Sequence, residues 1–122
     1  MSDTPLYERV GGRDAIRAVV EKAVDNHFDN PVIRTRYEHA DQSRAEMIEG
    51  ATEFFCTGLS GVETYEGRPL TEVHSGMNIN HEEFCAVLDD IVDAIDANGI
   101  RDPERSELLG ILYGMKPEIV RL

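Results

Sequence analysis

Apolar residues recur at three- and four-residue intervals along most of the chain, which is the period of an amphipathic α-helix. Four segments of substantial length show this period, two before and two after an irregular stretch at 60–79. None of them alternates apolar and polar residues as a half-buried strand does. The pattern therefore predicts an all-α protein in which two pairs of helices pack across each other around one core.

Polar residues, glycines and prolines mark where these helices begin and end. The first helix follows a Gly-Gly pair and must end near Asn30–Pro31, because a residue before proline avoids helical geometry. The second and third helices begin with the polar-x-x-Glu pattern of a capping box, at Ser43–Glu46 and Asn80–Glu83. Asp102 is expected to cap the fourth helix and Pro117 to end it, while Gly58 and Gly61 are expected to end the second.

Residues 60–79 break the helical period, and glycines and a proline punctuate the stretch. Only 70–77 has a pattern that could hold a turn or two of helix. A long irregular stretch in a small domain usually has a function, so this segment is the first place to look for chemistry.

The chain is strongly acidic, with 24 Asp and Glu against 12 Lys and Arg and a formal net charge of −12. Such a surface repels phosphate backbones and anionic lipid, so we expect no nucleic-acid partner and no membrane partner. Lys22 and Lys116 are the only lysines. High acidity with few lysines indicates adaptation to a salty cytoplasm, where salt screens the repulsion; an ordinary acidic protein is the alternative.

The chain shows no targeting or membrane-spanning signal. It has no apolar run of about 20 residues, and its first residues lack the basic-then-apolar order of a signal peptide. Cys56 and Cys85 lie in helical segments, which predicts free thiols and a cytoplasmic location. No linker or repeat divides the chain, so we expect residues 1–122 to form a single domain, as a monomer or a weak dimer.

His74 is the first candidate for a functional side chain. If 70–77 turns helically, His74 shares a face with Leu70, Val73 and Met77, and an imidazole facing an apolar pocket is a common metal ligand. The alternative, which these residues alone favour, is a core histidine satisfied by the backbone. The other histidines are expected at the rim of the core or in solvent: His27, His39 and His81.

Other catalytic and metal-binding motifs are missing from the sequence. It contains no His-Glu-x-x-His, no Cys-x-x-Cys, no Gly-x-Ser-x-Gly and no phosphate loop. The acidic pairs Glu82–Glu83 and Asp89–Asp90 are expected to be solvated helix faces. The residues alone therefore name no ligand.

Several ordered pieces together resemble a known family. They are Leu-Tyr-Glu-Arg-Val-Gly-Gly-Arg-Asp-Ala-Ile at 6–16, Asp-Asn-Pro at 29–31, Phe54–Phe55 before Leu-Ser-Gly at 59–61, and the run Tyr65, Gly67, Arg68, Leu70, Val73, His74, Met77 and Ile79, with Phe84 beyond it. In this order they are similar to the truncated haemoglobins, especially group I, over about residues 6–120. The resemblance implies a truncated globin, a two-over-two helical sandwich with an irregular segment that carries the proximal histidine.

The resemblance also implies a cofactor and a function. His74 becomes the axial ligand of a haem b iron that binds diatomic gas (O₂, CO or NO). The walls of the haem site would be apolar: Phe54, Phe55, Leu70, Val73, Met77, Phe84 and Leu88. Arg68 would pair with a haem propionate. Oxygen transport is one expected role. Some relatives oxidise nitric oxide with the help of a reductase, but we assign no enzyme activity here.

The ligand side of the expected haem site departs from the family pattern. Val24 stands where the family usually has a ligand-binding tyrosine, and Met47 and Ala51 stand at the two distal-helix positions that face the ligand. Tyr37 replaces the phenylalanine that packs on the haem, and its hydroxyl is the expected hydrogen-bond donor. Two alternatives stay open. One is a redox or ligand-sensing haem protein with an internal sixth ligand, and the other is a haem-free helical interaction module on the same fold.

Overall fold

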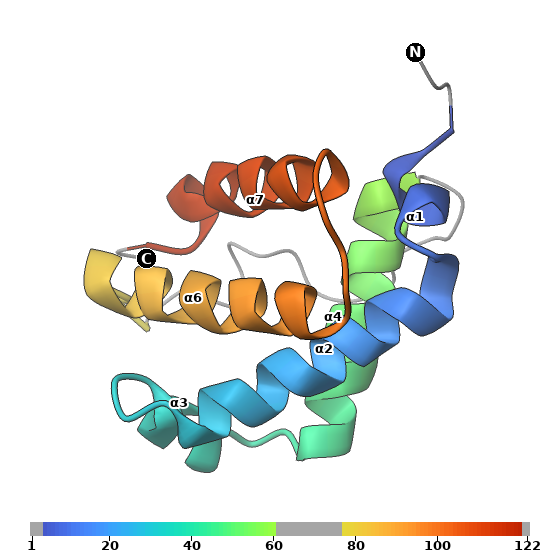
Figure 1. Ribbon diagram of the computed structural model, residues 1–122. Helices are drawn as coiled ribbons and strands as arrows, with labels where there is room; N and C mark the ends of the chain where they lie inside the picture. The colour runs from blue at the N-terminus through green and yellow to red at the C-terminus, as the bar shows by residue number, and fades with distance from the viewer. Residues whose placement is uncertain (1–3, 61–76, 121–122) are drawn as a thin grey trace.

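The computed structural model describes residues 4–60 and 77–120 (Figure 1). Its helices are α1 (Leu6–Arg9), α2 (Gly12–Asp29), α3 (Arg34–Glu38), α4 (Arg44–Ser60), α6 (His81–Ala97) and α7 (Glu104–Gly114), followed by the 3₁₀ turn η1 (Lys116–Glu118). The all-α class and the four long helices are confirmed. The predictions for Arg68, Leu70, Val73 and His74 lie outside the described residues.

The start of α2 depends on two glycines in a left-handed backbone conformation. Gly11 has φ 114° and Gly12 has φ 79°. A Cβ at Gly11 would stand 2.8 Å from the Cβ of Ala15, so no larger residue fits there without a shift. At its other end α2 stops at Asp29, one residue before the extended Asn30 that precedes proline, as the sequence predicts.

Both expected capping boxes are present. The Glu46 N–H donates to Ser43 Oγ (3.1 Å), and the Ser43 N–H donates to Glu46 Oε1 (2.9 Å). At α6 the Glu83 N–H donates to Asn80 Oδ1 (2.8 Å), and the Asn80 N–H donates to Glu83 Oε1 (3.1 Å). Each box satisfies two backbone N–H donors that a helix start would otherwise leave to solvent.

Two helix ends differ from the sequence prediction. Gly58 does not end α4, which continues to Ser60; a Cβ at Gly58 would meet nothing within 4 Å, and an exposed glycine costs a helix interior only about 1 kcal/mol. The last helix begins at Glu104, although the Asp102 carboxylate still accepts a hydrogen bond from the Ser106 N–H (3.1 Å). Pro117 lies in η1, beyond the end of α7, as expected.

Helix α2 is the element on which the others are assembled. Helices α4 and α6 both pack against α2, and α7 lies beside α6 (Figure 1). The core between α2 and α4 consists of Ile16, Val20, Val24, Ile48 and Cys56. By contrast, α4 and α6 make hardly any direct contact with each other.

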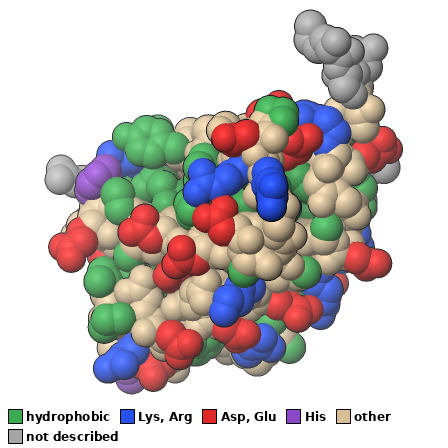
Figure 2. Space-filling view, in the orientation of Figure 1, with side chains coloured by type: hydrophobic (Ala, Val, Ile, Leu, Met, Phe, Trp, Pro, Cys, Tyr) green, Lys and Arg blue, Asp and Glu red, His purple; other side chains and the backbone are tan. Residues whose placement is uncertain are grey.

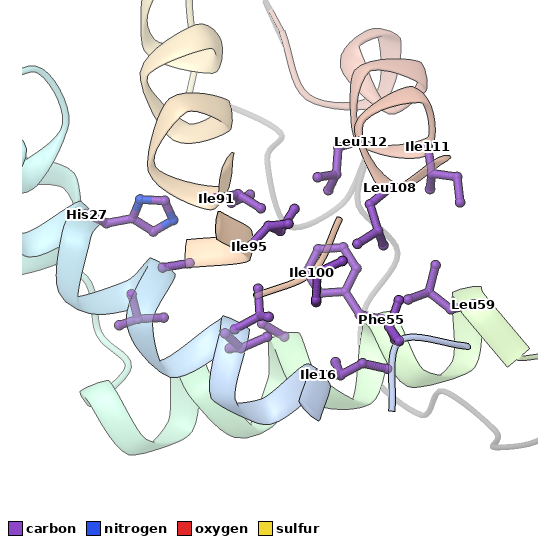
Figure 3. Close-up of a pocket in the computed structure, with 16 residues that line it drawn as sticks. Ile16, His27, Phe55, Leu59, Ile91, Ile95, Ile100, Leu108, Ile111 and Leu112 are labelled. Atoms are coloured by element: carbon purple, nitrogen blue, oxygen red, sulfur yellow. The ribbon is translucent and has the colours of Figure 1, made fainter. Parts of the chain in front are cut away.

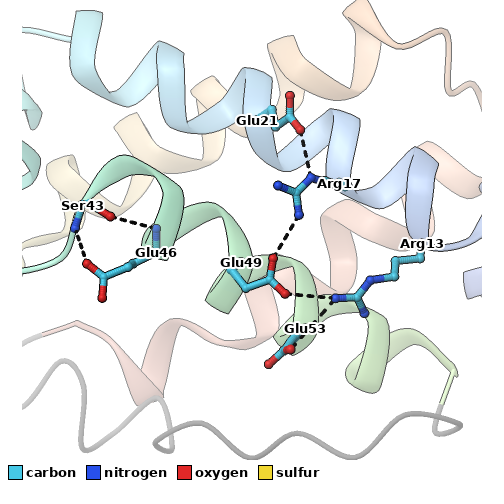
Figure 4. Close-up of polar contacts among 7 residues, drawn as sticks. All are labelled: Arg13, Arg17, Glu21, Ser43, Glu46, Glu49 and Glu53. Atoms are coloured by element: carbon cyan, nitrogen blue, oxygen red, sulfur yellow. Dashed lines mark hydrogen bonds and ion pairs between the residues drawn. The ribbon is translucent and has the colours of Figure 1, made fainter.

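Arginine–carboxylate pairs connect the exposed sides of α2 and α4 (Figure 4). Arg17 lies 3.0 Å from Glu49 and 3.1 Å from Glu21, and Arg13 lies 3.4 Å from Glu49 and 4.0 Å from Glu53. Figure 2 shows acidic and basic side chains interspersed on one face of the molecule. Exposed pairs of this kind each stabilise a fold by only about 0–1 kcal/mol, so they orient the two helices more than they stabilise them. No described helix is both long enough and apolar enough to cross a membrane.

Candidate functional site

An apolar pocket lies beside α2, between α4 on one side and α6 and α7 on the other (Figure 3). Its volume is about 90 Å³. The pocket is lined by Val10, Ile16, Val19, Val20, Ala23, Val24, His27, Ala51, Phe55, Leu59, Ile91, Ile95, Ile100, Leu108, Ile111 and Leu112. All of these side chains are apolar except His27. Such a space suits a small uncharged molecule and excludes an ion.

Two of the residues predicted on the ligand side line this pocket. Val24 is buried and lines the pocket, and Ala51 lines it from α4, together with Phe55. Met47 is partly buried on α4 and is not among the lining residues. Neither Val24 nor Ala51 has a side-chain hydrogen-bond donor, so this part of the pocket is apolar, as the sequence predicts.

Tyr37 lies on α3 and packs between two rings of α2. Its ring stacks on that of His27, with centroids 4.8 Å apart and planes at 19°, and meets Phe28 at 6.0 Å and 56°. Burial, with the charge of Asp90 as the next cause, raises the pKa of Tyr37 to about 12. The phenol therefore stays protonated at neutral pH and keeps an O–H donor.

A buried polar cluster joins α2 to α6. His27 is 6% exposed and Asp90 7% exposed, and His27 Nδ1 lies 2.8 Å from Asp90 Oδ2. Burial lowers the pKa of His27, although the Asp90 carboxylate acts in the opposite direction. At neutral pH the ring is therefore neutral and donates its Nδ1–H to the carboxylate. The predictions that His27 sits at the rim and that Asp90 is solvated were wrong.

The sequence contains a signal for this cluster that a strict apolar pattern misses. His27 follows Val20 by seven residues and Val24 by three, and so lies on the buried stripe of α2. Asp90 lies midway between Ala86 and Ala94 on the buried stripe of α6. Two polar residues at core positions on different helices indicate a buried pair.

The predicted aromatic walls lie on α4 and α6. Phe54 and Phe55 meet edge to face at 5.5 Å and 77°. Phe84 is 3% exposed and contacts Tyr113 of α7 at 6.3 Å, while Leu88 and Met77 are partly buried. The predicted haem walls therefore consist of apolar side chains from α4 and α6, and both of these helices pack on α2.

His81 and Cys85 form a pair that the sequence analysis overlooked. They stand one helical turn apart on α6, and Cys85 Sγ lies 3.4 Å from His81 Nε2. The i, i+4 spacing of a histidine and a cysteine on one helix was the signal. Within residues 4–60 and 77–120, no three His, Cys, Asp or Glu side chains gather as a metal site.

These helices and this pocket have the architecture of a truncated globin. The tertiary structure matches that of the truncated haemoglobin from Tetrahymena pyriformis in its Fe(III) form, with a TM-score of 0.90 and 21% identity over 98% of this chain and 100% of that one. It also matches the group II truncated haemoglobin from Bacillus anthracis, with a TM-score of 0.87 and 19% identity over 99% and 94% of the two chains. At these identities the likeness establishes the fold.

Sequence similarity goes further than the fold. Residues 5–120 match the family described as bacterial-like globin. The group 1 truncated hemoglobin GlbN of Mycolicibacterium paratuberculosis is 30% identical over 93% of this chain and 82% of that protein. A group 1 truncated hemoglobin GlbN of Synechocystis is 28% identical over 87% of each chain. The chain belongs to the bacterial-like globin family, among the truncated haemoglobins.

The family defines the class of function: a haem-binding globin that binds diatomic gas, with haem b as the cofactor. The described residues fit a haem. Apolar side chains of α4 (Ala51, Phe55 and Leu59) and of α6 (Ile91 and Ile95) line one pocket beside α2, and an apolar lining of this kind suits a flat apolar group. When bound, haem supplies the iron at which the gas binds.

Proposed function

We propose that His74 is the proximal haem ligand and that Tyr37 is the hydrogen-bond donor to the bound gas. The ligand side of this site is formed by Val24, Met47 and Ala51. Phe54, Phe55, Phe84, Leu88 and Met77, with Leu70 and Val73, form the walls, and Arg68 pairs with a propionate. The observation that supports this assignment is the chemistry around the pocket: the described residues that line it are apolar apart from His27, and the ring of Tyr37, which does not line it, stacks on His27.

The proposed donor has a consequence for selectivity between gases. Bound O₂ is polarised and gains from a hydrogen bond, whereas CO gains little. A neutral hydrogen bond contributes about 1 kcal/mol, which corresponds to about a fivefold change in an equilibrium or a dissociation rate. With Tyr37 as its one proposed donor, the site is expected to bind O₂ reversibly and to release it readily, as transport or storage in a cytoplasm requires.

The first experiment tests the proximal ligand. The purified chain is supplied with haem, and its absorption is recorded in the ferric, ferrous and CO-bound forms for the parent and for His74→Ala. The parent is expected to show a Soret band that changes with each form, and His74→Ala is expected to lose the histidine-ligated spectrum. A spectrum unchanged by His74→Ala would assign the proximal ligand to another residue.

The second experiment tests the donor. O₂ and CO dissociation rates are measured for the parent, for Tyr37→Phe and for the control Tyr113→Phe, a tyrosine that is 55% exposed on α7. Tyr37→Phe is expected to release O₂ about fivefold faster, with CO release unchanged. Equal O₂ rates in the parent and Tyr37→Phe would contradict the role of Tyr37.

An internal sixth ligand is the second candidate. Met47 is partly buried on α4, the helix that faces the ligand side, and its thioether is a known haem ligand. A low-spin ferrous spectrum without added gas, abolished by Met47→Leu, would favour a redox or ligand-sensing role. A five-coordinate ferrous spectrum would favour the gas-binding role, with a reductase as a further partner only if nitric oxide is turned over.

A further inference from the structure

Asp90 of α6 is the centre of a set of hydrogen bonds to Asn26 and His27 of α2 and to Asn30, the residue that follows α2. Besides His27, its carboxylate accepts from Asn30 Nδ2, at 3.1 Å to Oδ1 and 3.2 Å to Oδ2. Its backbone carbonyl accepts from Asn26 Nδ2 at 3.0 Å. Four hydrogen bonds thus converge on one residue that is 7% exposed. The position and the plane of the His27 imidazole are fixed by this arrangement, because Nδ1 has a single acceptor at 2.8 Å.

The face of the His27 ring contacts the ring of Tyr37. The helix that bears Tyr37, α3, has only five residues, and its other side chains are partly or fully exposed, so the Tyr37 ring depends on α2 for its packing. An ion pair between the side chains of Arg36 and Glu83 connects α3 to α6. The His27 ring lies nearly parallel to the Tyr37 ring, with centroids 4.8 Å apart, whereas the Phe28 ring is more distant and steeply tilted. The contact with His27 therefore determines the plane of the Tyr37 ring.

We propose that His27 is the positioning residue for Tyr37, with Asp90 holding the imidazole so that the phenol is presented to the ligand pocket. This inference rests on the proposed function of Tyr37 as the donor to the bound gas. It gives a role to His27, which is the one polar side chain among the described residues that line the pocket. Figure 3 shows the imidazole projecting from α2 toward that space.

The proposal explains why a histidine stands at a core position. An aliphatic residue at 27 would fill the volume but give Tyr37 no flat surface, and a phenylalanine would give a flat surface but leave Asp90 without its donor. Histidine does both, because its ring stacks through its face and bonds through its edge.

Two substitutions separate the ring from its hydrogen bond. His27→Asn places an amide N–H near the position of Nδ1, so it can still donate to Asp90, but it removes the stacked ring. The double variant His27→Phe with Asp90→Leu keeps a ring beside Tyr37 and removes the carboxylate that would otherwise be unpaired. His81→Asn, an exposed histidine of α6, is the matched control.

The functional readout is a double-mutant cycle on O₂ dissociation from the haem-loaded protein. His27→Asn is expected to raise the O₂ rate about fivefold, as Tyr37→Phe does, and the combination to raise it no further. The ring-retaining double variant and His81→Asn are expected to stay within about twofold of the parent. Additive effects of His27→Asn and Tyr37→Phe on the O₂ dissociation rate would overturn the proposal. So would an O₂ dissociation rate in the ring-retaining variant His27→Phe with Asp90→Leu that is as high as in His27→Asn.

A second readout does not depend on gas binding. With fluorotyrosine incorporated, the ¹⁹F resonance of Tyr37 is identified by its loss in Tyr37→Phe. It is expected to lie away from the free amino-acid value in the parent, to move toward that value in His27→Asn, and to stay in the ring-retaining double variant. A resonance unmoved by His27→Asn would refute the positioning role. If the chain took up no haem, the proposed function would fail, and this measurement on the folded chain would still decide the inference.

Discussion

The buried pair of His27 and Asp90 allows a quantitative prediction about stability. His27→Phe keeps the ring volume but removes the Nδ1–H donor, while Asp90 stays at 7% exposure with its carboxylate bound to Asn30 alone. Because His27 is neutral, this contact is a hydrogen bond to a buried carboxylate, and removing its donor costs about 1–3 kcal/mol, or more where the acceptor is charged. Asn30 still donates to that carboxylate, so we expect a loss of about 3 kcal/mol.

That loss is a large part of the stability of a chain of this size, which is typically about 5–15 kcal/mol. It corresponds to a drop of about 10 °C in the unfolding temperature. The double variant His27→Phe with Asp90→Leu removes the carboxylate as well, and we expect it to recover to within about 1 kcal/mol of the parent, since well-packed apolar residues can replace a buried pair at little cost.

The assay is urea unfolding at pH 8 in high salt, followed by circular dichroism, with His81→Asn as the exposed control. The parent, the control His81→Asn and the double variant should have similar urea midpoints. The midpoint of His27→Phe should lie well below theirs. If His27→Phe unfolded within about 1 kcal/mol of the parent, the carboxylate would not be held as a buried charge and the reasoning would fail.

Three further outcomes are expected. Burial lowers the pKa of His27 below 6.5, so as the pH falls through 6.5 the unfolded chain binds a proton at His27 that the folded chain does not bind. The free energy of unfolding should therefore decrease in this pH range, and a variant without His27 should not show this decrease. With a net charge of −12, the urea midpoint should fall as salt is withdrawn from about 1 M to about 0.01 M, and equal midpoints would contradict salt adaptation. Cys85, partly buried, should react with a thiol reagent in the native protein, whereas Cys56, 0% exposed, should react only on unfolding; two equally fast thiols would be inconsistent with this burial.

The helices were predictable because their signals are local. The capping boxes at Ser43 and Asn80 need only residues three positions apart, and both are present as the sequence predicts. The apolar periods of α2 and α6 are also read from one segment at a time. The resemblance that named the family likewise consists of short ordered pieces, and the family match confirms it.

The buried polar cluster was not predictable in the same way. His27 and Asp90 are 63 positions apart, and each alone follows the rule that a polar residue faces solvent. Only a fold that brings α2 against α6 shows that the two are partners. The stacking of Tyr37 on His27 was equally unpredictable, because the five residues of α3 form no apolar stripe that would indicate where its aromatic ring lies.

The two capping boxes should make both walls of the proposed haem site less stable at low pH. Ser43 lowers the pKa of Glu46 through hydrogen bonds, and Arg36 lowers that of Glu83, so both caps are complete above the pKa of a free glutamate and are lost as pH falls through the lower folded values. These caps begin α4 and α6, the two helices that face each other across the site without packing together. Acidification should therefore loosen both walls over one pH range, and the cofactor should dissociate while the α2 core is still folded.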